Sequence, residues 1–325
     1  MKGWIFRRYG GPEVLDWTDL PEPVPRRGEI AVRVVVAALN PLDWKLRAGQ
    51  LRLMTAGRLP RGVGYDYAGI VESTGEDVAR LKAGDAVVGI VNPMKSRQGT
   101  MAERVCATEA LATAKPESLS FVDGASLPGA GITAVQAFRD SHLAAGQRVL
   151  IVGAAGGVGS FAVQLAKDAG AHVTAVASTA GQSFLAMLAP DRRVDYQREN
   201  WKSLAGRFDI VFDASGTSTF PECRALLSPG GHYVHTLPNA ALFGWSWWLR
   251  LTSRQRCVPV MERPNLADLE TLVRLAAAGR LKSAVTRCAS SDELPALQRA
   301  MEGGHNHGKI VVRFAPDPLR PATGA

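Results

Sequence analysis

Residues 151–159 read IVGAAGGVG, and this stretch constrains the fold more than any other part of the chain. An apolar run enters a turn with four glycines, and the helix-like FAVQLAKDAG follows directly. Gly153, Gly156 and Gly159 stand three residues apart. Glycine allows a tight turn and brings backbone N–H groups within reach of a phosphate at the N-terminus of the following helix. The stretch therefore predicts a strand, a tight turn and a helix.

Further apolar strands alternate with helical periods around this turn. Near-continuous Val and Ile runs in such an alternation predict a parallel sheet that is covered on both faces. We expect strands at 148–152, 172–176, 192–196, 208–213, 230–236 and 257–261, and helices at 158–169, 181–189 and 219–227. The fold class predicted for this part is α/β, a doubly wound Rossmann domain over residues 122–262.

The rest of the chain is rich in β-type segments. Runs at 28–39, 67–74 and 85–91 are bounded by Gly and Pro, which indicates short strands in a barrel-like arrangement. An amphipathic helix over 265–279, with Asn265 as its N-cap, and a strand over 308–314 follow the Rossmann domain. We expect residues 1–121 and 263–325 to form one β-rich domain into which the Rossmann domain is inserted.

Composition narrows the class of protein. The 325 residues are 46% hydrophobic, with no apolar run near the ~18–20 residues that cross a bilayer and no secretory signal, so we expect a cytoplasmic protein of two domains. The net charge of +8 comes from dispersed arginines, which favours a solvated surface over nucleic-acid binding. The four cysteines show no metal or disulfide spacing, and we interpret them as small core residues.

The glycine turn in this setting predicts dinucleotide binding. We expect the pyrophosphate to lie against the backbone of Gly153, Ala155, Gly156, Gly157, Val158 and Gly159. A site that prefers NAD places Asp or Glu about 20 residues on, at the end of the second strand. Ser178 stands there instead, and it offers a hydroxyl and no carboxylate to repel a 2′-phosphate. The sequence therefore favours NADPH as the cofactor.

Several motifs follow one another in a recognisable order. They are NPLDWKLRAG (40–49), GYDYAGIVESTGEDVARLKAGDAVVG (64–89), GTMAERV (99–105), KPESLSFVDGASLPGAGITA (115–134), VLIVGAAGGVGSFAVQLAKDAGAHV (149–173) and HNHGKIVVRF (305–314). Together they resemble the zinc-free quinone oxidoreductase branch of the medium-chain dehydrogenase/reductase superfamily. The resemblance implies a GroES-like catalytic domain, a Rossmann domain between its two parts, and a homodimer joined through the Rossmann sheets.

The resemblance also implies roles for four residues of the substrate cleft. Asn40 is placed to hydrogen-bond substrate or nicotinamide, although it is equally read as a turn-former before Pro41. Asp43 lies in the same cleft segment, where a buried structural carboxylate is the favoured interpretation. Tyr65 is a candidate proton donor or a packing residue. Thr133 corresponds to a position close to the nicotinamide ring, or is a helix residue without ligand contact.

Further positions resemble cofactor contacts of the family. Tyr196 matches a tyrosine near the adenosine 2′-phosphate, while Gln182 stands near where relatives place a cation. His305, Asn306 and His307 correspond to a C-terminal loop that touches the cofactor, with His307 in place of an arginine. The charge of that contact would fall above pH ~6.5.

We expect no metal. Tyr65 replaces the histidine of the G-H-E motif of zinc-dependent relatives, and a cysteine ligand is missing near Asn40. A catalytic zinc needs about three protein ligands, and none of the six histidines precedes residue 142.

The leading hypothesis is an NADPH-dependent reductase of quinones or α,β-unsaturated carbonyls. A 2-enoyl thioester reductase is the runner-up, and a non-catalytic NADPH-binding sensor is the rival from another class. We expect a small electrophilic acceptor and a homodimer as partners, with no membrane and no nucleic acid. The tryptophan-rich segment 243–256 is interpreted as a dimer-interface or pocket-lid segment rather than a membrane contact.

Overall fold

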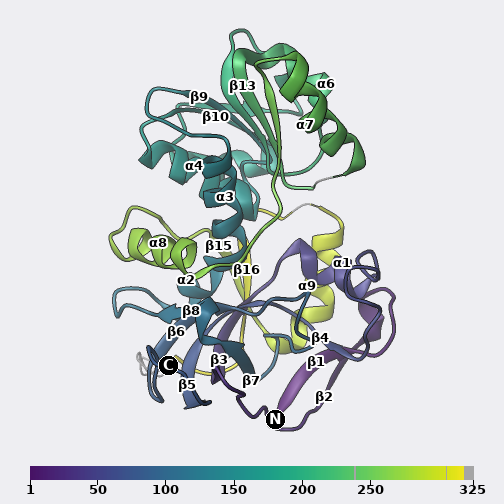
Figure 1. Ribbon diagram of the computed structural model, residues 1–325, viewed down its shortest axis with the longest axis vertical. Helices are drawn as coiled ribbons and strands as arrows, with labels where there is room; N and C mark the ends of the chain where they lie inside the picture. The colour runs from purple at the N-terminus through teal and green to yellow at the C-terminus, as the bar shows by residue number, and fades with distance from the viewer. Residues whose placement is uncertain (238, 305, 318–325) are drawn as a thin grey trace. The chain divides into compact units, whose positions relative to one another are not determined.

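The computed structural model describes residues 1–237, 239–304 and 306–317 (Figure 1). Contacts divide the chain into two compact units. The first contains residues 1–129, 264–278 and the chain from 285 onward, and the second contains residues 130–263 and 279–284. The first boundary falls eight residues after the predicted one at 121/122, because helix α2 (Phe121–Ser126) packs on the sheet of the first unit.

The first unit is built around a seven-stranded sheet, mostly antiparallel, with the order β15-β16-β3-β5-β6-β8 and β7 paired to β3. Its strands are β3 (Glu29–Ala38), β5 (Asp66–Thr74), β6 (Ala86–Ile90), β7 (Arg104–Thr108), β8 (Ala112–Ala114), β15 (Val285–Ser290) and β16 (Lys309–Arg313). A small sheet joins β1 (Lys2–Phe6), β2 (Leu15–Asp19) and β4 (Arg61–Gly62). Strand β3 pairs with β5, β7 and β16, so it connects the N-terminal strands to the C-terminal one.

Three further helices belong to the first unit: α1 (Pro41–Arg47), α8 (Leu266–Ala277) and α9 (Leu294–Glu302). The side chain of Asn265 accepts a 2.9 Å hydrogen bond from the Asp268 N–H, so the predicted N-cap of α8 is confirmed. Helices α1 and α9 are held together by Arg47, whose side chain is fully buried. Its guanidinium donates to Gln298 Oε1 at 2.6 Å and to the Gly10 carbonyl, and it pairs with Glu302.

The second unit contains a six-stranded sheet in which every pairing is parallel. The order is β11-β10-β9-β12-β13-β14, made of β9 (Arg148–Val152), β10 (His172–Ala177), β11 (Arg192–Asp195), β12 (Phe208–Asp213), β13 (Leu227–His235) and β14 (Arg256–Pro259). Val149, Leu150 and Ile151 of β9 are fully buried, as expected for a strand covered on both faces. The predicted α/β fold class and doubly wound sheet are confirmed.

Helices of the second unit are α3 (Pro128–Asp140, which starts in the first unit), α4 (Gly157–Asp168), α5 (Gln182–Leu188), α6 (Phe220–Cys223) and α7 (Ala240–Thr252). The helix expected over 219–227 consists of α6 and a 3-10 turn over Arg224–Leu226, after which β13 begins at Leu227. Helix α7 covers most of the tryptophan-rich segment and was not identified as a helix from the sequence. Within the described residues, none of the helices combines the length and apolar character needed to cross a lipid bilayer.

The cysteine interpretation holds for three positions and is wrong for the fourth. Cys106, Cys223 and Cys257 are buried, whereas Cys288 on β15 is exposed. The reason is that β15 is an edge strand of its sheet, with four of its six residues exposed.

Replacing Arg47 tests the link between α1 and α9. Arg47→Met would leave Gln298, Glu302 and the Gly10 carbonyl without their cation, which typically costs about 3–5 kcal/mol for a buried pair. Urea unfolding should show this loss, whereas Arg299→Met, on the exposed face of α9, should change the free energy of unfolding by less than about 0.5 kcal/mol. A loss below about 1 kcal/mol at Arg47 would contradict the structural role.

Candidate cofactor and active site

The glycine turn between β9 and α4 uses each of its three spaced glycines differently. Gly153 has φ +73°, a conformation that L side chains rarely adopt. A Cβ on Gly159 would lie 2.2 Å from the Gly153 carbonyl oxygen, so this glycine allows the helix to pack closely against the turn. Gly156 has an ordinary φ of −78°, and a Cβ there would meet only the Gly153 oxygen, at 3.3 Å. Gly156 therefore lies at the partly exposed start of α4, where a Cβ would touch one backbone oxygen.

The start of α4 offers N–H groups to a phosphate. Gly156 is the N-cap of the twelve-residue helix α4, and Gly156, Gly157 and Val158 are partly exposed. The first N–H groups of a helix have no acceptor within the helix, and the helix dipole adds partial positive charge there. Of the six predicted contact residues, Ala155 and Gly159 are buried, so they shape the turn rather than present surface to a ligand. This is the geometry expected of a pyrophosphate-binding turn, and the contacts of these six residues with a cofactor stay a prediction.

A second loop supports the turn from β12. Asp213, fully buried at the end of β12, accepts hydrogen bonds from the N–H groups of Ser215, Gly216 and Ser218 at 2.6–3.0 Å. Ser215 lies directly against Gly153, where a Cβ would come within 2.6 Å. His235 Nε2, at the end of β13, lies 3.8 Å from the Asp213 carboxylate. Sequence inspection did not single out Asp213; its only signal is an acidic residue at a strand end, followed by the small polar residues ASGTS.

The end of β10 carries the residues expected near the adenosine ribose. Ser178 follows β10 directly and is partly exposed, and Tyr196 is 53% exposed, with its N–H donating to the Ala177 carbonyl at 3.1 Å. The Gln182 side-chain amide donates to the carbonyls of Ala177 and Val194, so it braces β10 and β11. Ser178 and Tyr196 thus belong to the same end of the sheet.

The structure adds a carboxylate to this end that the inspection of position 178 missed. Asp195, the last residue of β11, pairs with Ala177 in the sheet and accepts a 2.5 Å hydrogen bond from the Thr179 hydroxyl. Its side chain is only 14% exposed, and the exposed Arg198 lies 3.5 Å away. The Asp195 carboxylate is therefore bonded to the residue that follows Ser178, and the Arg198 guanidinium partly balances its negative charge.

In the first unit, the predicted residues Asn40 and Asp43 belong to a buried polar cluster with Asp66 and Lys309. All four side chains are at most 4% exposed. Asn40 Nδ2 donates to Asp66 Oδ2 at 2.8 Å, and Lys309 Nζ donates to Asn40 Oδ1 at 2.5 Å and lies 3.5 Å from Asp66. The Asn40 N–H donates to Asp43 Oδ2 at 2.8 Å, which caps helix α1. These bonds favour structural roles for both residues.

Two buried carboxylates share the single ammonium group of Lys309 in this cluster. Burial raises the pKa of the Asp43 carboxyl to about 7, and the nearby Asp66 adds to the shift, whereas the Asn40 N–H and Lys309 oppose it. Burial also raises the pKa of Asp66. Sequence inspection missed Asp66 and Lys309, although both stand in quoted motifs, GYD and HGK.

The remaining predicted residues are placed as follows. Tyr65 is 5% exposed and lies against Gly129, where a Cβ would come within 2.7 Å of its ring. Thr133 lies on α3 and is partly exposed. Asn306 and His307 are partly exposed, and the His307 carbonyl accepts a 2.6 Å hydrogen bond from Thr286. His305 lies outside the described residues. The catalytic roles of Tyr65 and Thr133 remain predictions.

Two further observations concern metals and cavities. In the part of the chain that the structure describes, no three His, Cys, Asp or Glu side chains are grouped to hold a metal ion.

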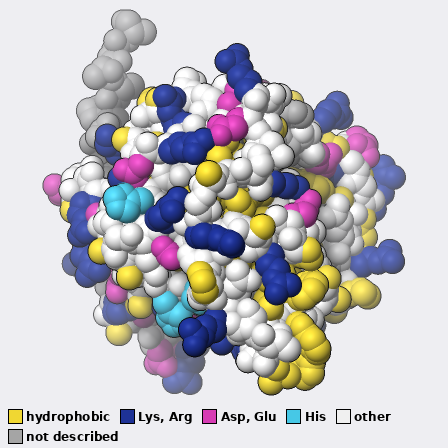
Figure 2. Space-filling view, turned by 90° about the horizontal axis from the view of Figure 1, so that it is seen from above, with side chains coloured by type: hydrophobic (Ala, Val, Ile, Leu, Met, Phe, Trp, Pro, Cys, Tyr) yellow, Lys and Arg dark blue, Asp and Glu magenta, His cyan; other side chains and the backbone are white. Residues whose placement is uncertain are grey.

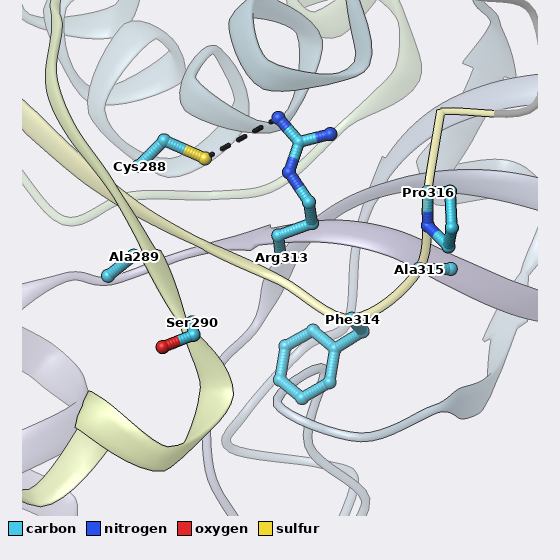
Figure 3. A pocket seen from close by; sticks show the side chains of 7 residues that line it. All are labelled: Cys288, Ala289, Ser290, Arg313, Phe314, Ala315 and Pro316. Carbon is cyan, nitrogen blue, oxygen red and sulfur yellow. Dashed lines mark hydrogen bonds between the residues drawn. The ribbon is translucent and has the colours of Figure 1, made fainter. Parts of the chain in front are cut away.

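An open groove of about 530 Å³ lies along β15 and β16, where Arg313 contacts the Cys288 sulfur at 3.7 Å (Figure 3). None of the predicted site residues lines this groove, so we do not assign the activity to it.

Comparison with known proteins places the chain in a family. Residues 26–177 match the model of the alcohol dehydrogenase GroES-like domain, and residues 188–312 match that of zinc-binding dehydrogenases. The chain is 35% identical over 318 residues to the chloroplastic quinone-oxidoreductase homolog of Spinacia oleracea, covering 93% of this chain and 95% of that protein. It is 37% identical over 223 residues to the chloroplastic NADPH-dependent alkenal/one oxidoreductase of Arabidopsis thaliana, covering 66% of this chain and 58% of that protein.

Solved structures agree with this placement. The quinone oxidoreductase from Coxiella burnetii superposes with a TM-score of 0.89 at 32% identity, covering 97% of this chain and 99% of that one. The chain therefore belongs to the medium-chain dehydrogenase/reductase superfamily of nicotinamide-dependent oxidoreductases, among its quinone oxidoreductase-like members. The resemblance drawn from the sequence motifs is confirmed at this level. The absence of zinc remains a prediction.

Paired glycine variants separate binding from stability. In Gly156→Val the Gly153 oxygen must move by a few tenths of an ångström, and the side chain covers the partly exposed start of α4, so dinucleotide affinity should fall more than tenfold in titration calorimetry. Gly159→Ala places a methyl group against backbone and should destabilise the fold by about 1–3 kcal/mol in thermal unfolding. Undiminished affinity in Gly156→Val would show that the binding site lies elsewhere.

The buried cluster predicts a pH dependence of stability. The folded-state pKa of Asp43, about 7, lies above its ordinary 3.8, so the fold favours the protonated form and loses stability as pH rises through that window. Asp43→Asn should flatten the decline in the free energy of unfolding between pH 4 and 7 by about 2–4 kcal/mol. The exposed Asp19→Asn serves as control. An unchanged slope in Asp43→Asn would contradict a protonated Asp43.

Proposed function

We propose that the protein is an NADPH-dependent reductase of quinones or α,β-unsaturated carbonyl compounds. The observation that carries the proposal is the partly exposed glycine turn at Gly156, which lies at the N-terminus of α4 and follows a buried parallel strand. Relatives named as quinone and alkenal/one oxidoreductases support the choice of acceptor.

The bound nicotinamide would supply the hydride. The chain's own contribution is to bind and orient the cofactor: the N–H groups at the start of α4 hold its phosphates, and Asp213 fixes the loop that packs on Gly153. Because Tyr65 stands where zinc-dependent relatives have a ligand histidine, we expect an acceptor that is already electron-poor. Tyr65 is also the candidate donor of the proton that completes the reduction.

A homodimer and a cytoplasmic location are parts of the proposal. Strand β14 ends the six-stranded sheet and, within the described residues, pairs only with β13. Its free edge can pair with the same strand of a second copy. The cytoplasmic location rests on composition alone.

The strength of the NADPH preference depends on two opposing contributions at the end of β10. Ser178 offers a hydroxyl to a 2′-phosphate, and Tyr196 lies exposed at the same end of the sheet. The carboxylate of Asp195, bonded to the neighbouring Thr179, opposes a dianion there. We therefore infer a modest preference for NADPH over NADH.

An oxidation assay tests the proposed activity. The purified protein should oxidise NADPH with benzoquinones, naphthoquinones or simple enones, and should retain this activity in a chelator. Turnover with crotonyl thioesters alone would favour an enoyl thioester reductase. Confirmed NADPH binding without turnover of any acceptor would favour a sensor, and one equivalent of zinc in elemental analysis would overturn the prediction of no metal.

Two substitutions should move cofactor preference in opposite directions. Ser178→Asp adds a second carboxylate and removes the hydroxyl, so NADPH affinity should fall by about one to two decades, roughly 1–3 kcal/mol. Asp195→Asn keeps the side-chain shape but removes the charge, so NADPH affinity should rise roughly threefold. NADH affinity provides the internal control and should not fall in either variant. An unchanged NADPH:NADH ratio in both variants would place the ribose elsewhere.

A further inference from the structure

Helix α7 has apolar side chains on two opposite faces. Leu242 and Leu249 are buried in the core of the second unit, and the Trp245 ring lies 5.3 Å from that of Phe220. The outer face carries Phe243, Trp247 and Leu251, which follow one another at four-residue spacing, together with Trp248. These four side chains are 47–69% exposed. The outer stripe of α7, Phe243, Trp247, Trp248 and Leu251, is therefore a large exposed apolar surface on a helix that is already anchored by its inner face.

Two exposed arginines, Arg250 and Arg254, lie in or directly after α7, and the acidic residues nearest to the helix in the sequence are Glu222 and Glu262. Residues 223–261 contain four arginines and no Asp or Glu. Arg224, Arg250 and Arg254 are exposed, and no ion pair involves them within the described chain. Near the C-terminal end of α7, Ser253 and Gln255 line an open groove of about 530 Å³ together with Arg207 and Arg224. On the face drawn in Figure 2, hydrophobic side chains gather near one edge, with Lys and Arg side chains beside them.

We propose that the outer stripe and its arginines form a docking surface for an anionic lipid bilayer. Tryptophan, phenylalanine and leucine on one helix face enter the boundary between headgroups and acyl chains, while arginines at the rim contact lipid phosphates. The helix has 13 residues and would lie in the plane of the interface. The proposal is an alternative to the expectation from the sequence that the protein has no membrane contact, which stays a prediction.

Charge disfavours a second copy of the chain as the occupant. A twofold contact centred on the outer stripe places the same patch on both subunits. It would leave Arg250 and Arg254 at the rim of the contact, and residues 223–261 of the second copy provide no carboxylate to pair with them. An anionic bilayer satisfies both the apolar stripe and the arginines.

Vesicle co-flotation of the full chain tests the proposal. Vesicles of phosphatidylcholine with 40% phosphatidylglycerol should bind the protein, and pure phosphatidylcholine should bind it at least about tenfold more weakly. Bromine-labelled acyl chains should quench tryptophan fluorescence in the bound state. Binding to anionic vesicles should weaken at high salt, because arginines at the rim contribute.

Matched variants test whether α7 itself makes the contact with the bilayer. Trp247→Gln/Leu251→Gln and Arg250→Gln/Arg254→Gln should each reduce vesicle binding about tenfold or more and keep NADPH binding, which reports folding. Met187→Gln removes an apolar side chain that is 64% exposed on α5 and should leave vesicle binding unchanged. Absence of wild-type binding to anionic vesicles, or equal binding by the α7 variants, would overturn the proposal. Conversion of a dimer to a monomer by Trp247→Gln/Leu251→Gln, without vesicle binding by the wild type, would assign the stripe to a subunit interface instead.

Discussion

The close backbone contact between Gly159 and the Gly153 carbonyl is the constraint on which the cofactor site depends. A single Cβ at position 159 would approach that oxygen to 2.2 Å, so α4 can begin this close to β9 only with glycine there. The contact fixes where the first N–H groups of α4 lie, and Gly156 lies at the partly exposed start of that helix. The buried Asp213 holds Ser215 against Gly153 from the neighbouring strand. Two strands therefore determine the geometry of one turn.

The first unit depends on a different kind of contact. Lys309, near the end of the chain, bonds to Asn40 and lies beside Asp66, so charge pairing joins segments that are far apart in the sequence. Buried polar groups persist when their partners are in place, and removing one partner leaves the others desolvated. This cluster, together with the pairing of β16 with β3, accounts for the C-terminal strand belonging to the N-terminal unit.

Local patterns in the sequence were sufficient to predict the doubly wound sheet and the glycine turn. Buried parallel strands appear in the sequence as continuous Val and Ile runs, and the glycine spacing indicates the turn directly. Two kinds of feature could not be predicted. The partners of Asn40 and the carboxylate beside Ser178 result from tertiary pairing, since Asp195 reaches Thr179 only across neighbouring strands. Helix α7 was not predicted because apolar residues occur all around it, which removes the amphipathic period by which a surface helix is identified.

The net charge of the chain illustrates the same difference between composition and fold. Arginines that look dispersed along the sequence indicate a uniformly solvated basic surface. Residues 223–261, with four arginines and no acidic residue, contribute +4 of the chain's +8, and this segment includes the exposed apolar face of α7. The acidic residues lie elsewhere, and several of them are bound to arginines or lysines, as in the pairs Arg280–Asp168 and Lys167–Asp191. Arg250 and Arg254 take part in none of these pairs, so their charge is available to the anionic surface that we propose for α7.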